Sequence, residues 1–397
     1  MPIRYRTELP TTAELVIVGG GVVGAATAFY AARAGLNPLL IERRPRLGTL
    51  TTPVSTGAFR LQFDNREELE MVRRSVELFL NFAEATEQRE YDLDIRQQGY
   101  LFLTTDQAGV DRQRKMVAAL HDWGQSDVEL LAGDDARRRF PYIAENVLQA
   151  RFRAGDGFLD PKALTMGLAV GAGAEVVTAC TVTGLRVAAG RLAAVETDRG
   201  VVSTEAAVIA AGPLSGLVAE QAGVQLPIET VRRHKIIMPL VPEAPGWAPM
   251  TIDEDTGAHW RPALHGAYLH FTDPATPASP PSEQVVADPD FPFRLLDPAS
   301  PVSVARVAPF WRQVWERGSA NWMLQAGQYT MTPDHRPLIG PTPVDGLYVN
   351  TGYSGHGIMG SPAGSRLLID VLSGAVPMDQ NPFRMDRALV ARGLDIL

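Results

Sequence analysis

The chain has one cysteine, Cys180, in 397 residues. A single cysteine excludes an internal disulfide framework and a zinc or iron–sulfur site built from several cysteines. Lysine is almost as rare, because Lys115, Lys162 and Lys235 are the only lysines and the other 34 of the 37 basic residues are arginines. The formal net charge is −8, with no basic block or basic tail. We therefore do not expect nucleic acid as a main partner.

The sequence also lacks a secretory signal, since the first fourteen residues contain no apolar core. One uncharged run, residues 15–32, is 18 residues long. Its middle contains Gly19, Gly20, Gly21 and Gly24, which disfavour a membrane-spanning helix. We expect no transmembrane segment and a cytoplasmic protein.

The same run predicts a parallel βαβ unit. Leu15-Val-Ile-Val18 is a short apolar run that is typical of a buried strand. Residues 22–34 are small and apolar and predict a helix that ends at Gly35. Residues 39–41 predict the next buried strand, which ends at Glu42. This unit indicates an α/β fold (α+β overall) with a Rossmann-like parallel sheet.

The rest of the chain continues to mix both kinds of element. We predict helices at 67–86, 109–123, 161–170, 303–317 and 361–372, and strands at 99–103, 175–187, 191–197, 201–204, 207–213 and 347–350. Residues 51–64 predict a polar loop. Residues 274–301 contain eight prolines and predict an extended loop.

Residues 19–24, Gly-Gly-Gly-Val-Val-Gly, fit the motif G-x-G-x-x-G between a strand and a helix. In such a motif Gly19 makes the turn, Gly21 lets a pyrophosphate approach the backbone, and Gly24 lets the helix pack on the strand. Glu42, eighteen residues after the last glycine, would accept a hydrogen bond from a ribose hydroxyl. The alternative is a glycine-rich turn without a ligand. The motif alone does not distinguish NAD from FAD.

A second glycine-rich turn precedes the last predicted helix, with four glycines in residues 352–360. Such a turn brings backbone N–H groups and the positive end of a helix close to a ligand. A reduced flavin carries negative charge at its N1–C2=O edge, which this arrangement would stabilise. The alternative is a loop that only caps the helix.

Three segments together resemble a known family. They are the turn 210–215 (Ala-Ala-Gly-Pro-Leu-Ser), the segment 329–341 that begins Tyr-Thr-Met-Thr-Pro-Asp, and the segment 346–362 with its glycine turn. At these residues the chain resembles the FAD-dependent D-amino-acid oxidase, glycine oxidase and sarcosine oxidase superfamily. It is most similar there to sarcosine oxidase and to the β-type chains of sarcosine and proline dehydrogenases. The resemblance runs from residue 15 to about residue 374.

The resemblance implies two domains made of discontinuous segments. Residues 1–90, 145–230 and 325–397 would form the FAD-binding domain with the parallel sheet. Residues 91–144 and 231–324 would form the substrate domain with a mostly antiparallel sheet. The expected FAD-contacting residues are Gly19, Gly21, Val22, Val23, Gly24, Glu42, Arg43, Ser55, Thr56, Gly57, Val182, Ala211, Gly212, Gly327, Gly352, Gly355, His356, Gly357, Ile358 and Met359.

The resemblance also implies a substrate pocket. Tyr329 stands where D-amino-acid and glycine oxidases carry an arginine and where sarcosine oxidases carry a tyrosine. Arg60 lies in a run, Arg-Leu-Gln-Phe, that resembles the Arg-Gln-Gln-Phe run of the β-type chains. A guanidinium can pair bidentately with a substrate carboxylate, although Arg60 could equally be a surface arginine.

Three histidines complete the predicted catalytic set of Arg60, His259, His270, Tyr329 and His356. His356 resembles a histidine at the flavin side. His270 matches a histidine near the substrate pocket, with a solvent-facing strand histidine as the alternative. His259 stands where the family often has an aromatic active-site residue. No two histidines have the spacing of a zinc site, so we predict no metal.

Departures from the family pattern concern the cofactor. Gly327 stands where sarcosine oxidases carry the cysteine that tethers the flavin, and residues 49–64 contain no histidine that could tether it. We therefore expect non-covalent FAD. The lysine that promotes the reaction with oxygen in sarcosine oxidases falls near Gly266, and a second pocket lysine falls at Met359. The electron acceptor is therefore open between oxygen and a quinone or partner protein.

The first functional hypothesis is FAD-dependent oxidation of a small amino acid, with a secondary or N-alkylated amine favoured. Hydride would pass to flavin N5, and water would hydrolyse the resulting imine. The alternatives are a 2-hydroxy-acid or polyol-phosphate dehydrogenase with a histidine base, a D-amino-acid oxidase, or a non-catalytic flavoprotein subunit. The chain could act as a homo-oligomer or within a complex.

Overall fold

The predicted βαβ unit forms the start of a parallel sheet in the computed structural model, which describes residues 3–318 and 321–391. The parts of the predicted domain ranges at residues 1–2, 319–320 and 392–397 lie outside the described residues. Strand β2 (Leu15–Val18) and strand β3 (Pro38–Ile41) pair in parallel and are joined by helix α1 (Val22–Arg33). All residues of both strands are buried, because helices and a further sheet cover both faces.

This unit belongs to a seven-stranded sheet in the order β1-β9-β3-β2-β13-β20-β19. All its pairs are parallel except β19 with β20. The added strands are β1 (Arg4–Tyr5), β9 (Glu175–Val177), β13 (Ala207–Ile209), β19 (Leu338–Pro341) and β20 (Leu347–Thr351). Helices α6 (Pro161–Ala172) and α10 (Gly357–Leu372) pack against α1, and α2 (Arg66–Leu80) packs against α10. A three-stranded sheet packs on the opposite face, formed by β10 (Val182–Ala188), β11 (Arg191–Thr197) and β12 (Gly200–Ser203).

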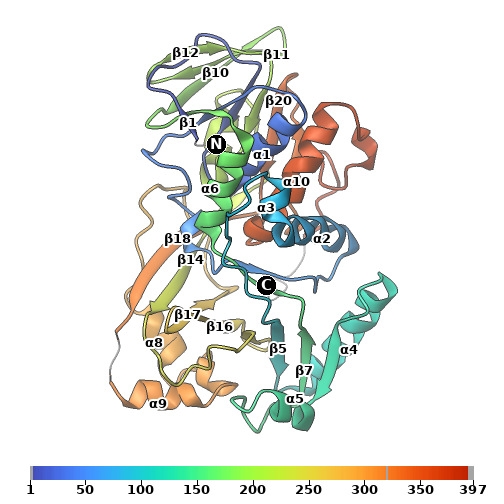
Figure 1. Cartoon of the computed structure of the whole chain (residues 1–397), viewed down its shortest axis with the longest axis vertical. Coiled ribbons are helices and arrows are strands. Elements are labelled where there is room, and N and C mark those ends of the chain that lie inside the picture. Colours follow the sequence, from blue (N-terminus) through green and yellow to red (C-terminus); the bar gives the residue numbers. More distant parts are fainter. Residues whose placement is uncertain (1–2, 319–320, 392–397) are drawn as a thin grey trace.

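The second half of the molecule is an eight-stranded sheet in the order β18-β14-β17-β16-β15-β5-β7-β6. Its strands are β5 (Tyr100–Thr104), β6 (Glu129–Ala132), β7 (Gln149–Arg153), β14 (Glu229–Met238), β15 (Met250–Asp253), β16 (Ala258–Ala263), β17 (Gly266–Phe271) and β18 (Met323–Met331). Only the β15–β5 pair is parallel. Figure 1 shows the two large sheets in opposite halves of the molecule along its long axis. The predicted fold class, a parallel sheet beside a mostly antiparallel one, is confirmed.

The remaining elements are short or lie at the edges of the two halves. They are α3 (Phe82–Ala85), α4 (Gln107–Asp122), α5 (Gly133–Arg139), α7 (Ser215–Glu220), α8 (Phe291–Leu296), α9 (Phe310–Glu316), β4 (Ala58–Phe59), β8 (Gly157–Phe158), η1 (Thr52–Val54), η2 (Gly212–Leu214), η3 (Val304–Arg306) and η4 (Met378–Gln380). Within residues 3–318 and 321–391, no helix combines the length and the apolar character needed to cross a bilayer.

Several local predictions were wrong. The predicted strand 175–187 is two strands in different sheets, because the chain turns at Ala179, where φ is +48°. The proline-rich segment 274–301 contains α8, with its proline at the second helical position, where no intrahelical N–H is lost. The predicted helix 303–317 is interrupted, and α9 begins only after Pro309. The predicted loop 51–64 contains η1 and β4.

The predicted domain ranges imply that β7 and β18 belong to the parallel sheet of the FAD-binding domain. Strands β7 and β18 lie in the eight-stranded sheet, although residues 145–230 and 325–397 were assigned to the FAD-binding domain.

Candidate functional site

The glycine motif forms a tight turn between β2 and α1. Gly19 has a φ of +113°, and a Cβ at this residue would lie 2.5 Å from the carbonyl oxygen of Ala210. A Cβ at Gly24 would lie 1.8 Å from the carbonyl oxygen of Gly19. Around Gly21, the N-cap of α1, the nearest atom to such a Cβ is Thr52 Oγ1 at 3.4 Å. Backbone packing therefore requires glycine at residues 19 and 24, whereas Gly21 leaves the start of the helix open to a ligand.

Glu42 at the end of β3 is bound to this turn. Its Oε2 accepts a hydrogen bond from the Gly20 N–H at 2.6 Å, and its Oε1 accepts one from the Arg44 N–H at 2.7 Å. Burial raises the pKa of Glu42, although both N–H groups and the nearby arginines act in the opposite direction. The carboxylate thus fixes the turn and also lines the cavity beside it.

A first cavity lies where the glycine turn, the end of β13 and the start of α10 meet. It is lined by fourteen of the twenty residues predicted to contact FAD: Gly19, Gly21, Val22, Val23, Glu42, Arg43, Ser55, Val182, Ala211, Gly212, Gly352, Gly355, Gly357 and Ile358. It is also lined by residues 48–52, Cys180 and Thr181, which the prediction omitted. The polar loop after β3 was the available signal for 48–52, because ligands of parallel sheets bind beyond the carboxyl ends of the strands.

Six predicted cofactor residues do not line the first cavity. Thr56, His356 and Met359 line a second cavity instead. Gly24, Gly57 and Gly327 line neither of these two cavities. Gly57 and Gly327 have packing reasons of their own, because a Cβ would lie 2.0 Å from the carbonyl oxygen of Leu159 and 3.1 Å from the Val54 side chain, respectively.

The second glycine turn leads directly into α10. The helix begins at Gly357, four residues earlier than predicted, with His356 as its N-cap. Gly352 and Gly355 have φ values of +74° and +101°, which favour glycine. Because these glycines and the first residues of the helix line the first cavity, its positive end is directed at that cavity.

The second cavity, of about 520 Å³, lies between the start of α10 and one face of the eight-stranded sheet. The residues that line both cavities are Ser55, Tyr329, Ser354, Gly355 and Ile358. They mark the place where the two cavities meet.

Tyr329 on β18, His270 on β17 and His259 on β16 form a stacked row across the eight-stranded sheet. The His259 and His270 ring centroids are 4.9 Å apart, and those of His270 and Tyr329 are 6.0 Å apart. His259 and Tyr329 line the second cavity, whereas His270 lies in the row without being part of that lining. Burial lowers the pKa of His259 to about 4 and that of His270 well below its usual range. Both rings are therefore neutral at pH 7, and His270 is buried rather than solvent-facing.

Arg60 lies immediately after β4 and is 2% exposed, so it is not a surface arginine. Its Nε donates to the Gln62 carbonyl oxygen at 3.2 Å, and its Nη2 is 3.4 Å from His356 Nε2. His356 Nδ1 is 3.2 Å from Glu68 Oε1, so these two contacts favour the tautomer with the proton on Nδ1. The predicted pair Arg60 and His356 is thus brought together in the second cavity.

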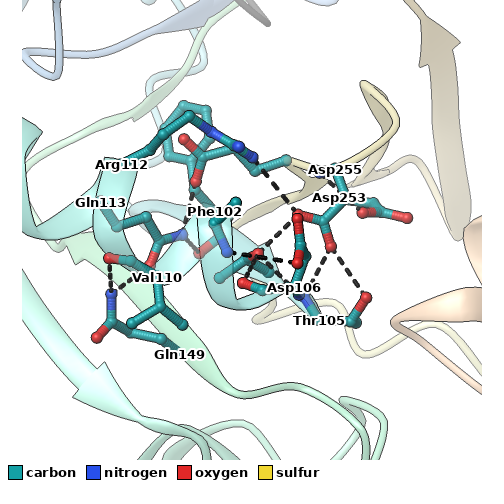
Figure 2. Close-up of polar contacts among 12 residues, drawn as sticks. Phe102, Thr105, Asp106, Val110, Arg112, Gln113, Gln149, Asp253 and Asp255 are labelled. Atoms are coloured by element: carbon teal, nitrogen blue, oxygen red, sulfur yellow. Dashed lines mark hydrogen bonds and ion pairs between the residues drawn. The ribbon is translucent and has the colours of Figure 1, made fainter.

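The opposite wall of the second cavity contains charged residues that sequence reasoning missed. Arg151 on β7 and Arg233 on β14 are buried there, and Glu254 is 3.3 Å from Arg151 Nη2. Helix α4 is fixed to this wall: Gln113 donates to the Phe102 carbonyl oxygen at 3.1 Å and to Glu254 Oε2 at 2.6 Å. Figure 2 shows this region, with Asp255 accepting from Thr105 and lying beside Arg112. The sequence did contain a signal for this wall. Arginine or lysine stands at alternate positions of β7 (Arg151, Arg153) and β14 (Arg233, Lys235), which places these side chains on one face of each strand.

Lys235 is a further buried residue near the cavities that the sequence analysis did not predict as part of the site. Its Nζ donates to the carbonyl oxygens of Pro53 and Ser55, at 2.5 and 3.1 Å. Burial, together with the nearby Arg261, lowers the pKa of Lys235 to about 7. Arg261 Nε donates to the Thr56 carbonyl oxygen at 2.7 Å. Two buried basic side chains, Lys235 and Arg261, therefore hold the loop 53–56, whose Ser55 lines both cavities.

The described parts of the chain contain no group of three or more His, Cys, Asp or Glu side chains arranged to hold a metal ion.

Comparison with known proteins identifies the family. The family model described as FAD dependent oxidoreductase matches residues 14–371. The chain belongs to this family. Its cofactor is FAD, and the glycine turn, the open start of α1 and the start of α10 fit such a dinucleotide.

Individual relatives agree with this assignment. The chain is 28% identical to FAD-dependent oxidoreductase domain-containing protein 1 of Xenopus laevis, over 91% of this chain and 79% of the relative. It is 26% identical to mitochondrial sarcosine dehydrogenase of Mus musculus, over 96% of this chain but only 42% of that longer protein. Among solved structures, L-proline dehydrogenase from P. horikoshii superposes with a TM-score of 0.80 at 25% identity, over 93% of this chain and 96% of that chain. The protein is an FAD-dependent oxidoreductase of the amino-acid oxidase and dehydrogenase family.

Proposed function

We propose that the protein oxidises a small amino acid, with a secondary or N-alkylated amine favoured, and that its FAD is bound non-covalently. One observation carries the proposal: the buried Arg60 faces the second cavity and lies 3.4 Å from His356, the N-cap of the helix that points into the first cavity. A carboxylate bound to Arg60 would leave the rest of a small substrate at the junction of the two cavities.

The cofactor supplies the redox chemistry when bound, since FAD accepts a hydride from the substrate C–H bond at N5 and leaves an imine that water hydrolyses. The residues of the first cavity would hold its dinucleotide part, with the pyrophosphate at the start of α1. The N-terminus of α10 would favour negative charge at the flavin end.

Non-covalent binding is supported by the absence of tethering residues at the expected places. Gly327 occupies the position of the tethering cysteine, and residues 49–64 contain neither cysteine nor histidine. Denaturation with acid should therefore release FAD into the supernatant. Flavin that stays with the precipitated protein would refute this part.

A secondary amine is supported by Tyr329 and by the substrates in the names of two similar proteins, sarcosine dehydrogenase and L-proline dehydrogenase. Hydride donation needs a neutral amine. The pKa of His259, which lines the second cavity, is lowered by burial, so this ring is neutral as well. The neutral His259 donates from Nδ1 to the Gly257 carbonyl oxygen at 3.0 Å, which leaves Nε2 as an acceptor for an N–H group.

The hydroxy-acid and polyol-phosphate alternatives require a general base within reach of the hydroxyl group. His270, the base suggested by sequence, does not line the second cavity, whereas His259 does and keeps Nε2 as an acceptor. The hydroxy-acid alternative is therefore tested in the same experiment as the amine. A D-amino-acid oxidase and a non-catalytic flavoprotein subunit are further alternatives that the same experiment tests.

The experiment is an anaerobic panel of primary amines, secondary amines and hydroxy acids, read as loss of the flavin's visible colour. We expect secondary amino acids to bleach the flavin most rapidly. Bleaching by hydroxy acids alone would refute the proposal, and no bleaching by any compound would favour a non-catalytic subunit. The rate at which oxygen or a soluble quinone reoxidises the reduced flavin then identifies the electron acceptor. Light scattering with and without candidate partners gives the assembly state.

A further inference from the structure

The strands of the eight-stranded sheet contribute two buried arginines, Arg151 and Arg233, to the wall of the second cavity. The strand registers place Lys235 opposite His270, His270 opposite His259, and Phe102 opposite Arg151. Residues at alternate positions of a strand share one face, so Arg233 lies on the same face of β14 as Lys235. Of these residues Arg151, Arg233 and His259 line the second cavity, whereas Lys235 is held by the loop 53–56.

Arg233 is a buried basic residue of the cavity wall without an ion pair among the described residues. It is 2% exposed, and the described residues provide no carboxylate within ion-pair distance. Asp273, which influences its pKa, is paired with Arg294 at 2.7 Å. The Arg233 guanidinium lies 5.8 Å from the Tyr329 ring centroid. Its Nη1 donates to the Arg232 carbonyl oxygen at 3.3 Å, and its Nε has no acceptor. A buried cation in this state is costly unless an anion accompanies it.

A second unsatisfied polar group lies beside it. Thr272 follows β17 directly, and the β14–β17 register, continued from the Lys235–His270 pair, places Thr272 opposite Arg233. The Thr272 hydroxyl is buried and has no hydrogen-bond partner. Both residues line the second cavity. An anionic group there could accept from the Arg233 N–H groups and from the Thr272 O–H group.

The other two buried arginines of the cavity, Arg151 and Arg60, differ from Arg233 in what they bind. Arg151 has Nε and Nη1 without acceptors, but its charge is paired with Glu254 at 3.3 Å and it lies 4.0 Å above the Phe102 ring. Arg60 is the residue that the proposed function assigns to the substrate's first carboxylate. A substrate with one carboxylate would therefore leave Arg233 without an anion.

The size and the entrance of the cavity agree with a larger and more acidic substrate. Its volume of about 520 Å³ falls within the range of roughly 300–1,000 Å³ found for pockets that enclose drug-sized ligands. Arg112 and Lys115 of α4 are exposed and line the same cavity, and Arg112 lies 3.8 Å from Asp255. With Arg60, Arg151 and Arg233 the lining has five basic residues against four carboxylates, Asp64, Glu68, Glu254 and Asp334. This excess favours the approach of an anion, although the chain as a whole is acidic.

We propose that Arg233 and Thr272 form a second anion subsite and that the substrate is an amine with two carboxylates. This inference rests on the proposed function, because it takes the first carboxylate to bind Arg60. The substrate class is then a dicarboxylic amino acid, with its second carboxylate between β14 and the end of β17.

The test compares an acidic substrate with its uncharged counterpart. The anaerobic bleaching assay compares N-methylaspartate with N-methylasparagine, and N-methylglutamate with N-methylglutamine. Each compound is used as the D and as the L isomer. We expect the wild-type protein to prefer the dicarboxylate by about 100-fold in kcat/KM, because the monoamide leaves the buried guanidinium without an anion. Equal rates for acid and monoamide would overturn the inference.

Variants then locate the preference. Arg233→Gln should lower the ratio of the two kcat/KM values by about 100-fold, and Thr272→Val by about 10-fold. Arg232→Gln is the matched control, since it removes the same charge from the opposite face of β14 and should leave the ratio unchanged. The visible flavin spectrum shows that each variant still folds and binds FAD. A ratio that changes equally in the Arg232 and Arg233 variants would contradict the subsite.

A binding measurement separates this inference from the proposed function. Thiodiacetate and methylthioacetate replace the amine nitrogen by sulfur, and both are titrated while the flavin spectrum is recorded. Tighter binding of thiodiacetate, lost in Arg233→Gln, supports the subsite even if no amine bleaches the flavin. Bleaching by amines together with equal binding of both thioethers would leave the proposed function intact and refute the subsite.

Discussion

Lys235 should make the stability of this protein depend on pH in a way that one substitution removes. Its ammonium group is buried, and its two hydrogen-bond acceptors are the carbonyl oxygens of Pro53 and Ser55. The pKa falls from 10.5 to about 7 in the folded protein. Between these values the unfolded chain binds a proton that the folded chain does not bind. Stability therefore rises with pH across this window and is lowest below pH 7.

The magnitude follows from the shift. A pKa difference from 10.5 to about 7 corresponds to a full change of about 5 kcal/mol, at about 1.4 kcal/mol for each pH unit. Between pH 7 and about pH 9.5 the free energy of unfolding should rise by about 3 kcal/mol through this residue.

The assay is chemical denaturation of wild type and Lys235→Met at both pH values with a fixed excess of FAD, because ligand binding itself contributes to stability. The wild-type increase should exceed that of the variant by about 3 kcal/mol. Lys115→Met is the matched control, since Lys115 is exposed and its loss should not change the pH dependence. The same increase in wild type and Lys235→Met would refute the reasoning.

Three further predictions concern the two cavities. Gly24→Ala should abolish FAD retention on purification, because the added Cβ would lie 1.8 Å from the Gly19 carbonyl oxygen and displace the glycine turn. The visible spectrum of the purified variant measures bound flavin, and a yellow variant would contradict the prediction. Arg60→Lys should lower kcat/KM for the substrate by about 100-fold, because an ammonium cannot bind a carboxylate bidentately; an unchanged value would remove Arg60 from the substrate site. His259 has a pKa of about 4, so its protonation should not affect turnover above about pH 6. A step in the wild-type pH profile near pH 6.5 that is missing from His259→Asn would show that the ring titrates normally.

The sequence predicted the cofactor half of the molecule better than the substrate half. Residues 15–41 were assigned correctly because an apolar strand, a glycine turn and a helix are local signals. Strand β14 pairs with β18, about ninety residues later, and no local pattern identifies such a partner. The strand 175–187 was misread because its apolar residues continue across a turn into another sheet.

The candidate site shows the same division. Arg60 was predicted through its resemblance to a known run, and the structure adds that it is buried beside His356. Lys235 and Arg233 were missed, because the role of a charged residue in a strand depends on what covers that face. His270 was expected in the pocket but lies in the stacked row without lining the cavity, since the same face of a strand can be covered by a neighbouring ring.

The position of Cys180 gives this protein a built-in reporter. The thiol is the chain's single cysteine, it is buried, and it lines the first cavity beside Thr181. A bound dinucleotide would cover it, and removal of the dinucleotide would open a path for a small thiol reagent. Because each chain carries one such group, the fraction of protein that reacts counts the chains that have lost their cofactor, with no other cysteine to contribute a background signal.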